Sequence, residues 1–164
     1  MSTNGALLRL EGVNTYYGQM HILKDVDLEV GEGELVCLLG SSGSGKSTLL
    51  RALAGLVPHF HGGGFSGRVE VGGRDTRTAR PSDLAGTVAT VFQDPEDQVV
   101  MTGVEHELQF GLEDVGVLPL EIPVRTLEAL GWIGAEHLVG RKTHELSAGE
   151  LQRVCVASAL ALRP

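Results

Sequence analysis

The chain has 164 residues, of which 42% are hydrophobic and 21% are charged, and its formal net charge is −8. These values are typical of a globular domain with its own core, and the negative charge argues against nucleic acid as the main partner, because phosphate backbones are bound by clustered Lys and Arg. The longest apolar runs are too short to span a bilayer, and the N-terminus does not resemble a signal peptide.

Alternating and continuous apolar runs predict the first half of the chain to be rich in strands. Strands are expected over residues 7–13, 22–30 and 35–39. The run 35–39 is apolar throughout, which is typical of a parallel strand buried on both faces. Cys37 in this run and Cys155 near the C-terminus are expected to be buried thiols and not a disulfide or metal pair.

The segment after this run fits the phosphate-loop pattern G-x-x-x-x-G-K-[ST]. Its glycines allow backbone N–H groups to turn around a phosphate, and the following helix adds the positive end of its dipole. Lys46 can reach the β- and γ-phosphates, and the Ser47 hydroxyl can ligate Mg²⁺. A chance glycine-rich turn is disfavoured by the flanking strand and helix. The predicted ATP-binding residues are Gly40, Ser41, Ser42, Gly43, Ser44, Gly45, Lys46, Ser47 and Thr48.

The remaining elements are mostly helical. A helix is expected over residues 47–56, strands over 67–71 and 87–92, and helices over 119–130 and 148–162. In the last helix, apolar residues recur on one face at helical spacing. Glu105 and Glu107 are expected on a solvated helix face.

Three further motifs distinguish among phosphate-loop proteins. Residues 146–153, Leu-Ser-Ala-Gly-Glu-Leu-Gln-Arg, resemble the signature of ABC ATPases, whose usual form is LSGGQ followed by x-Q-R. Residues 91–94, Val-Phe-Gln-Asp, resemble the Q-loop, and Tyr17 resembles the aromatic A-loop residue that stacks on adenine. The motifs occur in the same order as in ABC-transporter ATPases. The chain is similar to that family over essentially its whole length.

This resemblance implies an α/β fold of the P-loop NTPase class with an ABC-type nucleotide-binding core. Residues 1–93 would form the β-subdomain and P-loop core, and residues 94–164 the Q-loop, helical subdomain and signature helix. Family members continue with a strand that ends in Asp-Glu. The Asp supports Mg²⁺, and the Glu activates the attacking water. No such strand is found in this sequence, so we expect a fold that is incomplete at the C-terminus and a chain that binds ATP but hydrolyses little of it alone.

The resemblance also implies roles in a head-to-tail dimer that encloses ATP. Ser147 and the Gly149 N–H would contact ATP bound by the partner, although Ser147 and Glu150 also form an ordinary capping-box pattern. Gln93 would join Lys46 as a catalytic residue by ligating Mg²⁺ and sensing the γ-phosphate; a surface glutamine is the alternative. Tyr17 would stack on adenine, with Tyr16 as its competitor.

Two departures from the signature bear on this role. Ala148 stands where the family has glycine, and it would be strained if that position required a positive φ. Glu150 stands where the family has glutamine, and it adds a negative charge near the expected dimer interface.

Residues 92–99 and 104–111 resemble energy-coupling factor transporters, which import cobalt, nickel or vitamins. The implied partners are a second ATPase subunit, identical or different, a transmembrane coupling subunit and a substrate-binding membrane subunit, at the cytoplasmic face of the membrane. A non-transport ABC protein and a non-hydrolytic ATP-binding fragment are the alternatives; a P-loop kinase would lack the signature.

Overall fold

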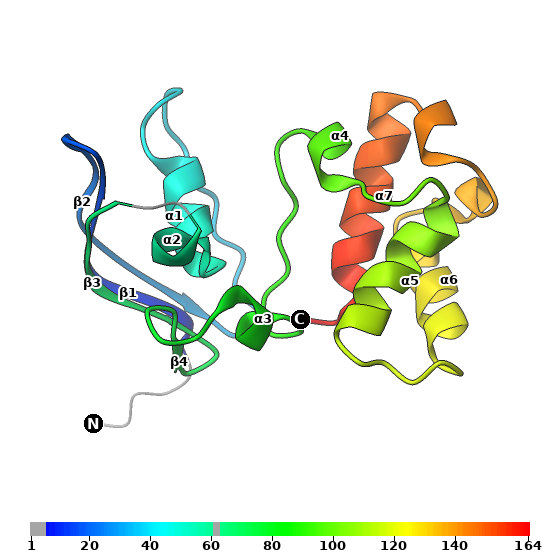
Figure 1. Ribbon diagram of the computed structural model, residues 1–164, viewed down its shortest axis with the longest axis horizontal. Helices are drawn as coiled ribbons and strands as arrows, with labels where there is room; N and C mark the ends of the chain where they lie inside the picture. Colours follow the sequence, from blue (N-terminus) through cyan, green and yellow to red (C-terminus); the bar gives the residue numbers. More distant parts are fainter. Residues whose placement is uncertain (1–5, 61–62) are drawn as a thin grey trace. The chain divides into compact units, whose positions relative to one another are not determined.

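The computed structural model describes residues 6–60 and 63–164 (Figure 1). The chain forms two compact units, Met1–Val88 and Ala89–Pro164, and each is described by itself. The expected domain division after residue 93 stays a prediction.

The first unit is built on a four-stranded antiparallel sheet with the order β2-β1-β3-β4. Its strands are β1 (Ala6–Tyr17), β2 (Met20–Gly31), β3 (Phe65–Val71) and β4 (Arg74–Asp75). The strands predicted over 7–13, 22–30 and 67–71 therefore form. Gly72 and Gly73, with φ of 54° and 75°, make the turn from β3 to β4, where a side chain would be strained.

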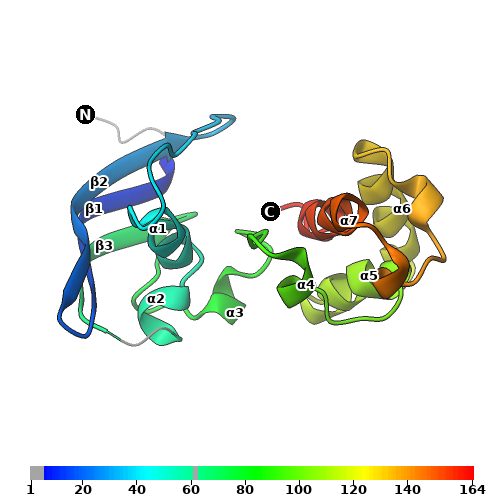
Figure 2. The ribbon, with the colours of Figure 1, turned by 90° about the horizontal axis from the view of Figure 1, so that it is seen from above.

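Helix α1 (Lys46–Leu53) and the short α2 (Leu56–His59) lie over the sheet, and α3 (Pro81–Leu84) follows β4 (Figure 2). The single helix expected over 47–56 is broken at Gly55, whose φ of 70° ends the first helix. The buried core of this unit joins the sheet to these helices and consists of Leu10, Val13, Leu23, Leu49, Ala52, Leu53, Val57, Val69, Val71 and Leu84.

The strands predicted over residues 35–39 and 87–92 were wrong, because neither segment belongs to a sheet in the described part of the chain. Leu35 is 96% exposed and Leu39 is 89% exposed. Cys37 is consequently exposed as well, whereas Cys155 is buried as expected. A strand that is apolar on both faces needs neighbouring strands at its edges and helices packed on both faces. Among the described residues, these segments have no neighbouring strands.

The second unit is helical. It contains α4 (Pro95–Gln98), α5 (Val104–Asp114), α6 (Ile122–Trp132) and α7 (Ala148–Ala161), with short 3₁₀ turns at Glu136–Leu138 and Thr143–Glu145. Helices α5 and α6 both pack against α7 (Figure 1). Their shared core consists of Val104, Leu108, Leu112, Ile122, Ala129, Leu130, Ala135, Leu138, Val154, Ala157 and Ala161. No helix in the described residues is both long and apolar enough to cross a membrane.

Glu107 corrects the expectation of a solvated carboxylate on α5. Its side chain is only 6% exposed, and Oε2 accepts hydrogen bonds from the backbone N–H groups of Val100 (3.0 Å) and Met101 (2.7 Å). A buried carboxylate needs such partners, because desolvating the charge is costly. Thr143 fixes the same segment from the other side, since its Oγ1 donates to the Met101 carbonyl at 2.8 Å. Glu107 therefore anchors the segment that follows α4.

The packing of the helical unit predicts a clear contrast between two leucines. Leu108 is fully buried, so Leu108→Ala should lower the free energy of unfolding of this unit by about 2–5 kcal/mol. Leu118 is 65% exposed, and Leu118→Ala should change it by less than about 0.5 kcal/mol. Urea unfolding followed by the fluorescence of Trp132, the only tryptophan, measures both. Equal losses for the two variants would contradict the assigned core.

Candidate functional site

The phosphate-loop segment has the backbone that its sequence predicts. Gly43 and Gly45 adopt φ of 81° and 94°, in the left-handed region that favours glycine. At Gly45 a Cβ atom would also come within 3.0 Å of the Leu23 side chain. These two turns bring the loop into α1 at Lys46, where the first helical N–H groups have no intrahelical partner. The loop thus ends in a set of amides suited to an anion.

Helix α1 holds this loop in place through its buried side. Leu49 and Leu53 are each 7% exposed and pack in the core with the sheet. Thr48 is buried too, at 6% exposure, whereas Ser47 is exposed. Of the two hydroxyl residues, only Ser47 presents its side chain to solvent. Ser47 is therefore the better candidate for a magnesium ligand, and Thr48 can contribute its backbone.

Lys46 closes over the loop that precedes it. Its Nζ donates to the carbonyl oxygens of Gly40 (2.9 Å) and Ser41 (2.8 Å) and to Ser44 Oγ (3.3 Å). These acceptors are neutral and exposed, so a phosphate oxygen can replace them as a stronger, charged partner.

The two tyrosines at the end of β1 have different surroundings. The Tyr16 ring stacks on the His21 imidazole with a centroid distance of 4.2 Å and an interplanar angle of 16°. The Tyr17 hydroxyl is buried without a hydrogen-bond partner among the described residues. Because His21 already covers one face of the Tyr16 ring, Tyr17 is the better candidate to stack on an adenine base.

Gln93 lies in an exposed bend just before α4. The bend is closed by Gln98, whose Oε1 accepts from the Phe92 N–H at 2.8 Å. Asp94 and Asp97 are exposed around it. The Gln93 side chain is therefore exposed to solvent, and Gln98 holds the backbone just before it.

The signature-like segment forms the start of α7. Ser147 is the N-cap, and its Oγ accepts from the Glu150 N–H at 3.4 Å. The Glu150 Oε2 in turn accepts from the Ser147 N–H (2.8 Å) and the Ser147 hydroxyl (2.7 Å). Ala148 is the first helical residue and has no positive φ, so it carries none of the strain considered above. Gly149 is exposed, with open space where a Cβ would lie.

The charge of Glu150 is stabilised by this cap. The hydrogen bond from the Ser147 side chain, and then that from its backbone, lower the pKa of the Glu150 carboxyl, with smaller contributions from the charges of Arg141 and His137. A lowered pKa means that the charged form persists as pH falls through the ordinary range of a glutamate. Glu150 is therefore ionised at neutral pH.

The candidate residues are divided between the two units. Tyr17 and the phosphate loop belong to the first unit; Gln93, Ser147 and Gly149 belong to the second. Sequence reasoning missed the supporting residues Glu107, Gln98 and Thr143. The burial of Glu107 could be predicted from its position, since it lies three residues after Val104 and one before Leu108 on the buried side of α5.

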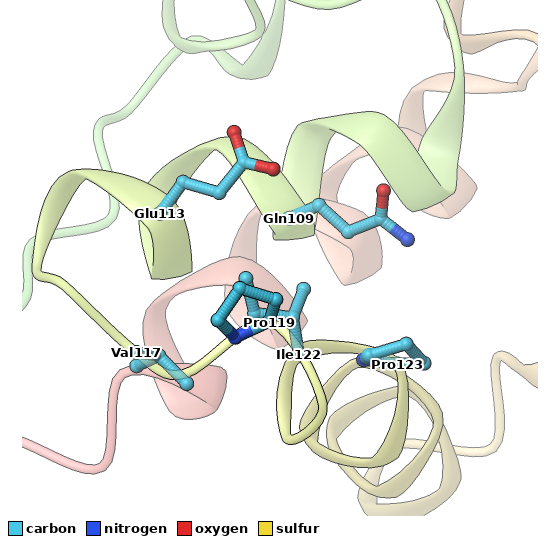
Figure 3. A pocket seen from close by; sticks show the side chains of 6 residues that line it. All are labelled: Gln109, Glu113, Val117, Pro119, Ile122 and Pro123. Carbon is cyan, nitrogen blue, oxygen red and sulfur yellow. The ribbon is translucent and has the colours of Figure 1, made fainter.

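A separate hollow of about 430 Å³ lies between α5 and α6 in the helical unit (Figure 3). Its wall consists of Gln109, Glu113, Val117, Pro119, Ile122 and Pro123. Glu113 is the one charged residue in this wall and has the same sign as a phosphate, so the hollow does not suit a nucleotide phosphate.

The groups of the phosphate loop fit ATP with Mg²⁺. The positive-φ glycines expose backbone amides, Lys46 supplies a cation, and Ser47 supplies an exposed hydroxyl. Bound Mg²⁺ would neutralise part of the triphosphate charge. The loop residues and Lys46 would hold the phosphates, and Ser47 would hold the metal.

Sequence comparison identifies the family of the chain. The profile of the family described as ABC transporter matches residues 23–164. A putative ABC transporter ATP-binding protein of Streptomyces avermitilis is 47% identical over 160 residues, and one of Methanosarcina acetivorans is 45% identical over 152 residues. These alignments cover 96% and 92% of this chain. The chain spans only 28% and 24% of the lengths of these relatives.

Solved structures confirm the predicted fold class. CbiO1 from Clostridium perfringens, described as part of the ABC transporter complex cbiONQ, superposes with a TM-score of 0.83 at 31% identity. The match covers 98% of this chain and 63% of that one. A nucleotide-free ATP-binding cassette from an ABC transporter matches with a TM-score of 0.76 at 29% identity, covering 97% and 66%. The β-sheet unit and the helical unit are thus those of an ABC-type P-loop domain.

The geometry of Lys46 generates a first prediction for this site. Lys46→Ala should abolish or severely weaken ATP binding, because the loop loses its only long cation. Isothermal titration of Mg·ATP measures the loss. Lys24→Ala, which removes an exposed lysine from β2, is the matched control and should bind like the parent. Equal affinity of the Lys46 variant and the parent would refute the assignment.

The adenine contact generates a second prediction. Tyr17→Ala should weaken ATP binding by about 1–3 kcal/mol, the range for one base–aromatic stack. Tyr16→Ala should have a much smaller effect, since its ring is stacked on His21. Titrations with ATP compare the variants, and the reverse order of losses would move the adenine contact to Tyr16.

Proposed function

Because the chain belongs to the ABC transporter family, we propose that it binds Mg·ATP and powers an importer of the energy-coupling factor type. The observation that carries the proposal is the phosphate loop, in which Gly43 and Gly45 turn the backbone and Lys46 lies across it. Membership of the family supplies the ATP-binding role. The importer type is supported by the resemblance of residues 92–99 and 104–111 and by the likeness to cbiO1.

Each candidate residue has a role in this proposal. The residues from Gly40 to Thr48 hold the phosphates, Ser47 and Gln93 ligate the magnesium ion, and Tyr17 stacks on adenine. Lys46 stabilises the charge that develops at the γ-phosphate during hydrolysis. We assign no residue of this chain to activation of the attacking water: Glu107, the most enclosed carboxylate near the Q-loop, is already engaged by two backbone amides.

The second half of the site comes from another ATPase domain. We propose that Ser147 and the Gly149 amide contact the γ-phosphate of ATP held by that domain, as the start of α7 supplies a hydroxyl and helix N-terminal amides. The cap is compatible with the contact by the Gly149 amide, because Ser147 Oγ accepts from the Glu150 N–H and the Gly149 N–H keeps no intrahelical partner.

The relatives suggest where the second ATPase domain is found. This chain spans 28% of the Streptomyces avermitilis protein but 63% of cbiO1. The curated relative therefore has room for about two domains of the cbiO1 size in one polypeptide. We propose a pair of ATPase domains as the functional unit, acting on a membrane-embedded coupling subunit and a substrate-binding subunit from the cytoplasmic face.

The contact with the membrane partner can be tested by cross-linking. Asp97 is exposed on α4, next to Gln93, and a photoreactive group on Asp97→Cys should link to a cytoplasmic helix of a membrane protein in the full complex. The same group on Glu136→Cys, exposed in the same unit but outside residues 92–99 and 104–111, should give weak links or none. Links that form only within the ATPase would contradict the coupling role.

A further inference from the structure

Of the two departures from the ABC signature, Glu150 is the one that changes the charge of the segment. Ala148 fits the helix without backbone strain. Glu150 replaces an uncharged amide with a carboxylate at the third helical position, beside the Ser147 hydroxyl. Glutamine can cap a helix in the same way, so the difference between the two residues is the charge and the amide donor.

The carboxylate already uses the groups that a phosphate would need. A serine hydroxyl has one proton to donate, and here that proton goes to Glu150 Oε2 at 2.7 Å. The Ser147 N–H donates to the same oxygen at 2.8 Å. The Ser147 Oγ lone pair accepts from the Glu150 N–H. A phosphate oxygen, which can only accept, must therefore displace Glu150 to bind Ser147.

The charge of Glu150 is only partly balanced locally. Among the residues that the structure describes, it forms no ion pair. Arg141 and His137 lie close enough to act on its charge, but the Arg141 Nη2 donates to the Glu145 carbonyl at 3.1 Å. Two like charges a few ångströms apart repel each other noticeably even in a hydrated site.

From this geometry we propose that Glu150 restrains the binding of ATP between the two ATPase domains, by competing with the γ-phosphate for the Ser147 hydroxyl and repelling it. The inference rests on the proposed role of Ser147 in contacting the partner's ATP. Closure around ATP then requires Glu150 to release Ser147, so closure occurs only when the other contacts are complete. The cost falls on ATP and not on ADP, because only ATP has the phosphate that Ser147 contacts.

The test is a comparison of nucleotide affinities for Glu150→Gln in the full-length protein. The probes are Mg·AMP-PNP, which carries an uncleaved γ-phosphate, and Mg·ADP, each titrated by calorimetry. Glu150→Gln should raise the affinity for AMP-PNP about tenfold and leave that for ADP unchanged, since the repulsion is removed and the amide can donate to phosphate. The gain should shrink as ionic strength rises, because salt screens an exposed charge.

Two controls separate charge from structure. Glu136→Gln removes the same charge from an exposed site in the same unit, and it should leave both affinities unchanged. Glu150→Ala removes the charge together with the carboxylate half of the capping box, so it should keep part of the gain for AMP-PNP while lowering the unfolding temperature. A loss of ADP binding in any of these variants would reveal damage to the fold.

Ser147→Ala distinguishes the failure of this inference from failure of the proposed function. If Ser147→Ala weakens AMP-PNP binding while Glu150→Gln binds it like the parent, Glu150 is no restraint and the signature role stands. If neither variant changes the preference for AMP-PNP over ADP, the signature does not contact the γ-phosphate and both proposals fail. A gain in Glu150→Gln that is independent of salt would also overturn the electrostatic account.

Discussion

The phosphate-binding part of the candidate site depends on the conformation of two glycines. Gly43 and Gly45 hold positive φ values that turn the loop so that its amides and the start of α1 converge. Only a residue without a Cβ adopts such angles at little cost. The sheet enforces this arrangement, because Leu49 and Leu53 fix α1 against it and Leu23 packs beside Gly45. Phosphate recognition is thus a property of the backbone, and the core of the first unit keeps that backbone in place.

Local patterns in the sequence predicted the parts of the fold that local interactions stabilise. The strands β1 and β2 form a local antiparallel pair, as do β3 and β4, and α7 begins at a serine followed by a glutamate three residues later. The pairing of β3 with β1, which joins segments distant in the chain, required the structure. The strands expected at 35–39 and 87–92 depend instead on partners and covering helices distant in sequence. Apolar runs predict the tendency to form such strands but cannot supply their partners.

The candidate site was predictable in the same way where all the groups that it needs lie in one short motif. Residues 40–48 carry the turns, the cation and the hydroxyl together, so the sequence predicts the backbone turns that the structure has, and their roles toward ATP stay predictions. The prediction of an exposed Glu107 was wrong. Charged side chains are usually solvated, but the position of Glu107 between Val104 and Leu108 indicates burial. The contrast of Tyr16 with Tyr17 required the structure, since only the structure places His21 on Tyr16.

The exposure of residues 35–39 has a consequence for handling the protein. Leu35-Val36-Cys37-Leu38-Leu39 contains no charge, proline or glycine, and Leu35 and Leu39 are almost fully in solvent. Such a segment is a template for strand pairing between molecules and favours amyloid-like assembly. Cys37 in its centre can also oxidise to join two molecules that meet there. The acidic residues Glu32 and Glu34 flank one end only, so purification of these 164 residues calls for low concentration and a reductant.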